Sequence, residues 1–296
     1  MPRSEWPCWC CARGMANDHR RDQRRSALMQ ASADTTPLGL HWWKAVPNFG
    51  DALSPVVLAH VAGRPVAHAG VRKAEVWAIG SLLQVVKRNF SEAQDHRPVI
   101  WGAGLLHPVQ GTGFVDHVDI ALVRGPITAA LLGLELSEFG DPGLLINAVW
   151  PQERAPNGKI GIVPHHSLVE DPVLQALIAS DTRYQLIDPR GEAQDVCAAI
   201  AACDHVFASS LHGLIVADAY GVPNSWLAPI GQSRLKYLDY AASVGRPLRA
   251  PINVEDIPTA VLPDPLSPLS YQAGIDACRT ALYARFPKAL QAGRAA

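Results

Sequence analysis

Short runs of apolar residues alternate with amphipathic stretches of helical period from Leu38 onward. In the first half of this pattern we predict strands at residues 38–45, 74–83, 98–106, 117–123 and 138–146, the last with a Gly-Asp-Pro-Gly turn at residues 140–143. One helix is predicted through Ser54 to Val61, with Gly63 as its stop signal, and another has Pro126 in its first turn. This order of strands and helices is typical of an α/β protein.

A second series of the same kind follows a linker-like segment. Residues 151–159 are rich in proline, asparagine, glycine and charge, which indicates a boundary between two compact units. Beyond this boundary we predict strands at residues 159–167, 184–189, 205–210 and 223–228. The predicted helices are 171–180, 192–204, 211–221 and a final amphipathic helix from about Tyr271 to Leu290.

The two series together predict an α/β fold of two facing Rossmann-like domains with a C-terminal helix. Strands that take turns with helices imply right-handed crossovers and therefore parallel sheets. Ligands collect at the carboxyl ends of parallel strands, so the site is expected in a cleft between the domains. The predicted division is a basic, disordered tail at 1–36, domains at 37–152 and 153–262, and a linker with the C-terminal helix at 263–296.

Composition argues against several classes of protein. The 296 residues carry a formal net charge of -1, so no global field favours nucleic acid, and an anionic ligand must meet a local cluster of cations. The six cysteines lack the dense spacing of a disulfide scaffold and indicate a reducing cytosol. No segment has about eighteen uninterrupted apolar residues, so none is predicted to span a bilayer.

The N-terminal tail carries two weak signals. Arginines outnumber acids in the first thirty residues, which favours contact with an anionic membrane surface only slightly. The Cys-Trp-Cys-Cys motif at residues 8–11 lacks the second pair of ligands that a structural zinc site needs. We therefore predict no metal site there.

Polar side chains follow the predicted strands of the first half. Asn48 and Asp51 stand at a helix start, where they either cap free backbone N–H groups or hydrogen-bond the hydroxyls of a sugar-like substrate. Arg124 ends a strand beside a helix amino terminus, where a guanidinium can hold phosphate or carboxylate in bidentate fashion. The alternative is a surface arginine that pairs with an acid such as Asp141.

Histidines and serines occupy the corresponding strand ends of the second half. His165 and His166 have no accompanying zinc motif, so hydrogen bonding to a ligand or proton transfer is favoured over metal binding. Ser209 and Ser210 end a buried strand, and His212 opens the next helix. The helix dipole disfavours the protonated form of His212 unless an anion binds beside it. This histidine therefore either carries a proton to a substrate or serves as a capping and packing residue.

Six segments, taken in order, resemble the polysaccharide pyruvyl transferase family. They are NFGDALSP, AIGSLL, VIWGAGL, LVRGPIT, GDPGLLI and SSLHGLIVADAYGVP, and the similarity covers roughly residues 38–250. The Asn-Phe-Gly-Asp start and the Leu-His-Gly helix start carry most of the resemblance. Within the family, the sequence is most similar to enzymes that decorate bacterial exopolysaccharides of the succinoglycan or xanthan kind.

The resemblance implies a two-domain fold like that of the GT-B glycosyltransferases, with an acceptor side in the first domain and a donor side in the second. It implies transfer of pyruvate from phosphoenolpyruvate to a sugar as a cyclic ketal, with release of phosphate and no metal or redox cofactor. The acceptor is expected to be a lipid-linked oligosaccharide at the cytoplasmic face of the inner membrane, which the protein reaches by peripheral contact.

The family's motifs also suggest roles for single residues of this chain. The arginine of its Arg-X-Pro segment falls on Arg124, which is expected to hold the donor's phosphate or carboxylate. The histidine of its Leu-His-Gly segment falls on His212, the expected general acid. A lysine that precedes an aromatic-X-Asp segment falls on Lys236, which gives a second contact to the anion.

One position departs from the family pattern. Many relatives have an arginine immediately before Leu-His, where this chain has Ser210. Donor binding is therefore also expected to use Ser209, Ser210, Arg234, His165, His166 and the helix amides after Ser210. Asp51, His165 or His166 is expected to accept a proton from the sugar hydroxyl.

Two other functions fit the same motifs. A glycosyltransferase of similar fold would use a nucleotide sugar, with Arg124 and Lys236 on the diphosphate. A non-catalytic glycan-binding or scaffold protein would explain the missing arginine at Ser210. Dependence of phosphate release on both phosphoenolpyruvate and a sugar separates the three.

Overall fold

The computed structural model describes residues 36–247 and 250–292. The predicted disordered tail, with its arginines and its cysteine motif, lies almost entirely outside these residues. The first sheet is five-stranded, with the order β2-β1-β3-β4-β5, and every neighbouring pair is parallel. Its strands are β1 (Leu38–His41), β2 (Val66–His68), β3 (Val76–Trp77), β4 (Val99–Trp101) and β5 (Asp119–Leu122).

The second sheet is four-stranded and also fully parallel, with the order β7-β6-β8-β9. Its strands are β6 (Ile160–Val163), β7 (Tyr184–Leu186), β8 (His205–Ala208) and β9 (Asn224–Trp226). The prediction of an α/β protein with parallel sheets is confirmed. Residues 151–159, the predicted linker, contain no helix or strand and run between the two sheets.

Helices connect most of the strands, and their ends follow local capping signals. Asn48 caps the first long helix by accepting the N–H of Gly50, and Gly63 ends that helix in the left-handed conformation at φ 66°. The helices are α2 (Phe49–Ala62), α3 (Leu83–Asn89), α4 (Pro126–Leu132), α5 (Ile146–Val149), α6 (Pro172–Ser180), α7 (Ala193–Ala202), α8 (Leu211–Ala219), α9 (Leu235–Ser243) and α10 (Gln272–Arg285). Among the described residues, no helix has both the length and the apolar character that crossing a membrane requires.

The predicted strand at residues 138–146 is wrong. Pro142–Leu145 form a 3₁₀ helix that leads into α5. Pro142 has a fixed φ and no N–H for a strand ladder, and the Asp141 carboxylate accepts the N–H of Gly143 at 3.0 Å. This buried turn packs against α2, α8 and α10. Its apolar residues therefore fill the space between the helices of the two halves.

Several predicted boundaries also need correction. The last helix ends at Arg285, because Phe286 precedes Pro287 and adopts an extended conformation. The predicted strands 38–45 and 74–83 are too long, since β1 ends at His41 and α3 begins within the second of them. The sequence pattern missed β2, α3 and α9.

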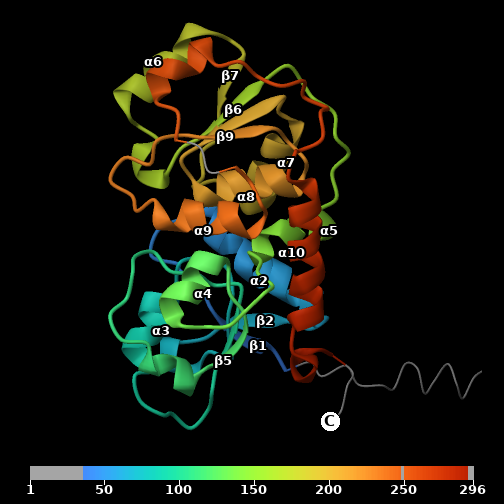
Figure 1. Ribbon diagram of the computed structural model, residues 1–296. Coiled ribbons are helices and arrows are strands. Elements are labelled where there is room, and N and C mark those ends of the chain that lie inside the picture. Colours follow the sequence, from blue (N-terminus) through green and yellow to red (C-terminus); the bar gives the residue numbers. More distant parts are fainter. Residues whose placement is uncertain (1–35, 248–249, 293–296) are drawn as a thin grey trace, which may run out of the picture.

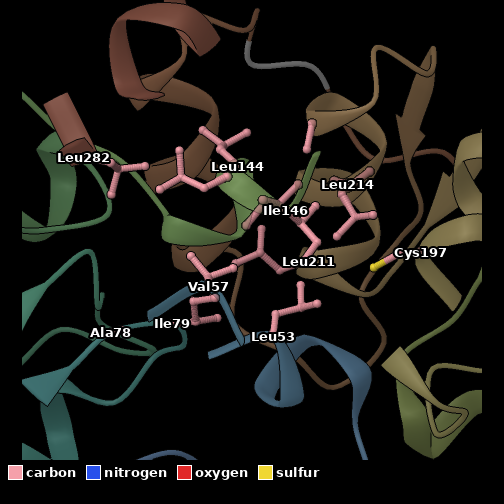
Figure 2. Packing of buried hydrophobic residues seen from close by; sticks show 14 of the residues in the cluster. Leu53, Val57, Ala78, Ile79, Leu144, Ile146, Cys197, Leu211, Leu214 and Leu282 are labelled. Atoms are coloured by element: carbon pink, nitrogen blue, oxygen red, sulfur yellow. The ribbon is translucent and has the colours of Figure 1, made fainter. Parts of the chain in front are cut away.

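One hydrophobic cluster joins the two sheets, and a further cluster lies in each half. Figure 1 shows α2, α5 and α8 between the sheets, and α10 along one side. Leu53 and Val57 of α2 pack in one cluster with Leu211 and Leu214 of α8 (Figure 2). Burial of these side chains stabilises the arrangement by about 1.5–3 kcal/mol each. The packing holds the amino-terminal turns of α2 and α8 in a fixed relation.

Helix α10 fastens both halves to each other. Its Leu282 carbonyl accepts the Trp101 indole N–H at 3.0 Å, from the first sheet. Its Arg279 guanidinium donates to the Ala219 carbonyl at the end of α8 and to the Leu144 carbonyl in the turn before α5. The C-terminal helix is therefore part of the framework that positions the site.

Candidate active site

The amino-terminal turns of α2 and α8 meet face to face. Ser210 caps α8 by accepting the N–H of Gly213, and His212 lies in the first turn of that helix. A Cβ atom on Gly50 of α2 would lie 2.2 Å from His212 Nδ1, so this contact requires glycine at position 50. The predicted convergence of strand ends and helix starts from the two halves is thus observed at these residues.

His212 is buried at this contact, with only 8% of its surface exposed. Its Nε2 atom is also buried and has no hydrogen-bond partner among the described residues. Burial lowers the pKa of His212 to about 3, and the positive charges of Lys236 and Arg124 act in the same direction. His212 is therefore uncharged at neutral pH, and an unpaired buried ring nitrogen of this kind is available to a ligand.

Asp51 sits in the first turn of α2, partly buried beside the glycine turn after β3. A Cβ atom on Gly80 would lie 3.6 Å from Asp51 Oδ1. Burial raises the pKa of Asp51 to about 7, and attraction to Lys236 opposes this shift. The capping role falls to Asn48, so the carboxylate of Asp51 is left for the site.

Lys236 extends from α9 into the same region. Its Nζ makes one long hydrogen bond, at 3.3 Å to Gln232 Oε1, and lies 5.1 Å from the centre of the Tyr237 ring. Among the described residues it forms no salt bridge. Burial lowers the pKa of Lys236 to about 8, Arg124 lowers it further, and Asp51 opposes both. A partly buried ammonium without a carboxylate partner is suited to an anionic ligand.

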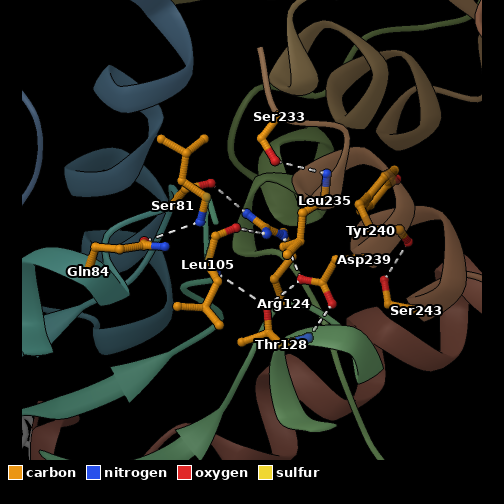
Figure 3. Close-up of polar contacts among 11 residues, drawn as sticks. Ser81, Gln84, Leu105, Arg124, Thr128, Ser233, Leu235, Asp239, Tyr240 and Ser243 are labelled. Atoms are coloured by element: carbon orange, nitrogen blue, oxygen red, sulfur yellow. Dashed lines mark hydrogen bonds and ion pairs between the residues drawn. The ribbon is translucent and has the colours of Figure 1, made fainter. Parts of the chain in front are cut away.

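Arg124 is completely buried, which corrects the alternative of a surface arginine paired with Asp141. Its Nε donates to Asp239 Oδ2 at 3.0 Å, its Nη1 to Ser81 Oγ at 2.9 Å and its Nη2 to the Leu105 carbonyl at 2.8 Å (Figure 3). The guanidinium lies against Gly104, where a Cβ atom would come within 2.3 Å of Cζ. Arg124 thus holds α9 and the loops after β3 and β4 together through its hydrogen bonds, and its positive charge acts on the groups nearby.

Asp239 is the residue that sequence reasoning missed. Besides Arg124, its carboxylate accepts the backbone N–H of Thr128 at 2.8 Å and the hydroxyl of Thr128 at 2.7 Å (Figure 3). These bonds tie α9, which carries Lys236, to the start of α4 beside the first sheet. The aromatic-X-Asp segment that follows Lys236 was the available signal.

Asp141 also belongs to the buried polar group. Its Oδ2 has no hydrogen-bond partner among the described residues, and burial raises its pKa to about 6. Arg124 attracts this carboxylate and Asp239 repels it, so the three charges lie near one another. The Gly-Asp-Pro-Gly motif predicted a turn at Asp141 but did not indicate that its carboxylate belongs to a buried polar group.

The histidine pair follows β6 and lies near Lys236. The His165 backbone N–H donates to Ser209 Oγ at 2.9 Å, which joins the ends of β6 and β8. Burial lowers the pKa of His165 to about 4, with further lowering by His166 and Lys236. The two imidazole rings are 4.1 Å apart, and His166 Nδ1 is buried without a partner in the described structure.

Not every predicted residue reaches this group. Arg234 precedes α9 and is exposed, and no polar contact of its side chain joins it to the other candidates. Ser209 serves the framework, because its carbonyl accepts the Tyr237 hydroxyl at 2.5 Å. Across the described residues, no three His, Cys, Asp or Glu side chains form a group that could hold a metal ion.

Comparison with known proteins finds one family model that matches the middle of the chain. Residues 86–229 match the model of the polysaccharide pyruvyl transferase family. This confirms the family predicted from the motifs. The matched segment contains Arg124, His165, Ser210 and His212, whereas Asp51 and Lys236 lie on either side of it.

Two curated proteins are similar to parts of the chain. The succinoglycan biosynthesis protein ExoV of Rhizobium meliloti (strain 1021) is 36% identical over 145 residues, which are 46% of this chain and 44% of ExoV. The uncharacterized protein L143 of Acanthamoeba polyphaga mimivirus is 26% identical over 171 residues, 53% of this chain and 58% of L143. The matches thus span about half the length of these relatives. No solved structure gives a significant match.

Proposed function

We propose that this chain transfers pyruvate from phosphoenolpyruvate to two hydroxyls of a sugar in a bacterial exopolysaccharide repeat unit, forming a cyclic ketal and releasing phosphate. The observation that carries the proposal is the meeting of His212, Asp51 and Lys236 where two helix starts face each other. The family match and the similarity to ExoV support the same reaction.

The chemistry requires a proton on the donor's methylene carbon. Protonation there makes the central carbon oxocarbenium-like, so a sugar hydroxyl can attack it and form a new C–O bond. The C–O bond to phosphate then breaks, and a second hydroxyl of the same sugar closes the ketal ring. One molecule of phosphoenolpyruvate and one diol thus give one ketal and one phosphate, with both hydroxyl protons released to bases, to phosphate or to water.

His212 is the proposed proton donor. In the unliganded protein it is neutral, because its pKa is lowered to about 3. A phosphate and a carboxylate bound beside the ring favour the imidazolium form, so donor binding would load the proton that the reaction uses. The unpaired Nε2 atom is the group that would face the donor.

Asp51 is the favoured proton acceptor among the three candidates. A base with a pKa of about 7 is well matched to neutral conditions, whereas His165, with a pKa of about 4, is a weak base. Asn48 and Asp51 are the proposed contacts to the acceptor sugar. The half that carries α2 would then be the acceptor side of a GT-B-like arrangement, and the half that carries α8 the donor side.

Cationic and amide groups would hold the donor. We assign the closest charge contact to Lys236, which lacks a carboxylate partner. The amides after Ser210, the Ser210 hydroxyl and the rings of His165 and His166 complete the proposed anion site, and the Ser209 hydroxyl positions the backbone of His165. Arg124 would add its buried positive charge, and Arg234 would contribute only after a rearrangement of its exposed side chain.

Phosphate release tests the function directly. The purified chain is incubated with phosphoenolpyruvate and the lipid-linked oligosaccharide repeat unit of an exopolysaccharide, and free phosphate is measured. Release that needs both substrates, together with a mass gain of the sugar equal to pyruvate minus water, is expected. The unfolding temperature of the chain is measured with each ligand as well. A rise with nucleotide sugars and none with phosphoenolpyruvate would overturn the proposal. We place the reaction at the cytoplasmic face of the inner membrane, where such acceptors are exposed.

A further inference from the structure

Asp141 is a fully buried carboxylate with one unpaired oxygen. Its Oδ1 accepts the Gly143 N–H at 3.0 Å, whereas Oδ2 has no hydrogen-bond partner among the described residues. Asp141 is 0% exposed, so a ligand in the site does not touch it, and a partner for Oδ2 has to come from the protein. Burial of a carboxylate oxygen without a partner costs free energy, so such a group points to a role in function.

The turn at Asp141 does not account for this burial. Asp-Pro pairs that begin at Asp171, Asp188 and Asp264 form the same turn, in which Oδ1 accepts the N–H two residues further on at 2.8–3.0 Å. All three of these aspartates are at least partly exposed. The turn therefore forms equally well with its carboxylate at the surface, and the buried position of Asp141 has another cause.

Arg124 does not neutralise Asp141. The Arg124 guanidinium pairs with Asp239 at 3.0 Å, and its other hydrogen bonds go to Ser81 and to the Leu105 carbonyl. The charges of Arg124 and Asp239 offset each other. In the part of the chain that the structure describes, Asp141 takes part in no salt bridge. Its carboxylate is therefore left without a counter-charge of its own.

His212 lies across Gly143 from this carboxylate. A Cβ atom on Gly143 would lie 3.2 Å from Asp141 Oδ1 and 3.8 Å from His212 Cδ2, so a single carbon atom there would contact both groups. Burial is the main cause of the shifted pKa of each group, and the positive charge of Arg124 acts on both as well. His212 keeps 8% of its surface exposed, so its ring reaches the site although Asp141 does not.

The other titratable groups around the turn do not supply the missing charge. The turn packs against α2, α8 and α10. On α10, burial and then the charge of Asp141 raise the pKa of Cys278 to about 11, so this thiol stays neutral. Arg279 forms its ion pair within the same helix. On α2, Asp51 is itself an acid. His212 on α8 is thus the group beside Asp141 that can become positive.

We propose that Asp141 is a positioning residue for His212, and that its carboxylate is the counter-charge of the imidazolium that forms when the anionic donor binds. This inference rests on the proposed pyruvyl transfer. The imidazolium gives its proton to the methylene carbon of phosphoenolpyruvate and returns to imidazole. The Asp141 carboxylate keeps its own bonds throughout and touches neither substrate. An opposite charge beside the ring favours the protonated form that the reaction uses.

Asp141→Asn removes the charge and keeps an oxygen for the Gly143 N–H. A neighbouring opposite charge changes an ionisation constant by about 10- to 10³-fold, so we expect kcat to fall by about that factor. The unfolding temperature should not fall, because the variant loses a buried charge that has no partner. Asp264→Asn, at an exposed copy of the same turn, is the matched control and should leave both kcat and the unfolding temperature unchanged.

Proton uptake gives a readout that a purely structural residue would not change. Calorimetry with phosphoenolpyruvate alone, in buffers of different ionisation enthalpy, measures the protons taken up on binding. It is run near pH 7.5, where Asp141, with its pKa of about 6, is ionised. We expect Asp141→Asn and His212→Gln each to take up fewer protons than the unaltered chain. The double variant should match His212→Gln in both uptake and kcat.

The outcomes separate the role of Asp141 from the reaction itself. Unchanged proton uptake or unchanged kcat in Asp141→Asn, or a further loss in the double variant, would overturn the role of Asp141. Reduced uptake in both single variants of a chain that releases no phosphate from phosphoenolpyruvate and sugar would support the pairing and overturn pyruvyl transfer. A chain that does not bind phosphoenolpyruvate would overturn both.

Discussion

Gly50 and His212 touch across the two halves of the molecule, and no side chain fits between them. A Cβ atom on residue 50 would lie 2.2 Å from His212 Nδ1 and 2.5 Å from Cγ, well inside any normal contact. The ring of the proposed proton donor is therefore positioned by the absence of a side chain on the opposing helix.

Gly50→Ala should displace the His212 ring and reduce kcat by about 10²-fold, since small misplacements of a reacting group have effects of this size. The same substitution in a His212→Gln background should cause little further loss, because the ring that it displaces is gone. Gly70→Ala is the control, as a Cβ atom there meets nothing within 4 Å. Phosphate release assays on all four variants measure the coupling. An equal loss from Gly50→Ala in both backgrounds would mean that Gly50 acts on stability alone.

His212→Gln should lower kcat by about 10²–10⁴-fold, the range in which positioned acids contribute. The fold should tolerate the change, because His212 is uncharged and its Nε2 has no hydrogen bond to lose. His205→Gln replaces another buried histidine outside the site and should retain turnover. Thermal unfolding and phosphate release are measured together. A variant that melts earlier but keeps its activity per folded molecule would identify His212 as a packing residue.

Donor affinity should fall as pH rises from 6 to 9. Above about pH 7 Asp51 becomes negative and repels an anion, and above about pH 8 Lys236 loses the charge that attracts it. Both pKa values rise when an anion binds, so binding takes up protons. Calorimetry with phosphoenolpyruvate in buffers of different ionisation enthalpy measures the uptake. Asp51→Asn should remove the step near pH 7, and Lys236→Gln the step near pH 8. An affinity that does not change across this range would mean that the charges of Asp51 and Lys236 do not act on the bound donor.

The parts of the structure that the sequence predicted are those with local causes. The parallel sheets followed from alternating strand and helix patterns, and the start of α2 from Asn48 and its neighbours. The strand prediction at 138–146 was wrong because these apolar residues are buried by tertiary packing rather than by a sheet. Pro142 and Gly143 determine the local backbone conformation. Apolar runs that contain such residues are ambiguous without knowledge of what they pack against.

The sequence predicted which of the candidate residues lie near one another better than it predicted their contacts, and their roles stay predictions. His212, Asp51 and Lys236 were placed correctly near one another by motif, since strand ends of parallel sheets gather at one edge. The burial of Arg124 was not foreseen, because its partner Asp239 is 115 positions away and lies on a helix that the pattern missed. The Gly50 contact was not foreseen either, since it depends on how α2 and α8 cross.

Asp239→Asn should destabilise the protein by about 3–5 kcal/mol, because it leaves the Arg124 guanidinium buried without a counter-charge. Asp119→Asn is the matched control, since it breaks an ion pair with Arg97 in which both side chains are at least half exposed. That change should cost about 0–1 kcal/mol. Urea unfolding of both variants gives the two free energies. If Asp239→Asn cost no more than Asp119→Asn, the buried pair would not hold α9 against α4, and the position of Lys236 would need another explanation.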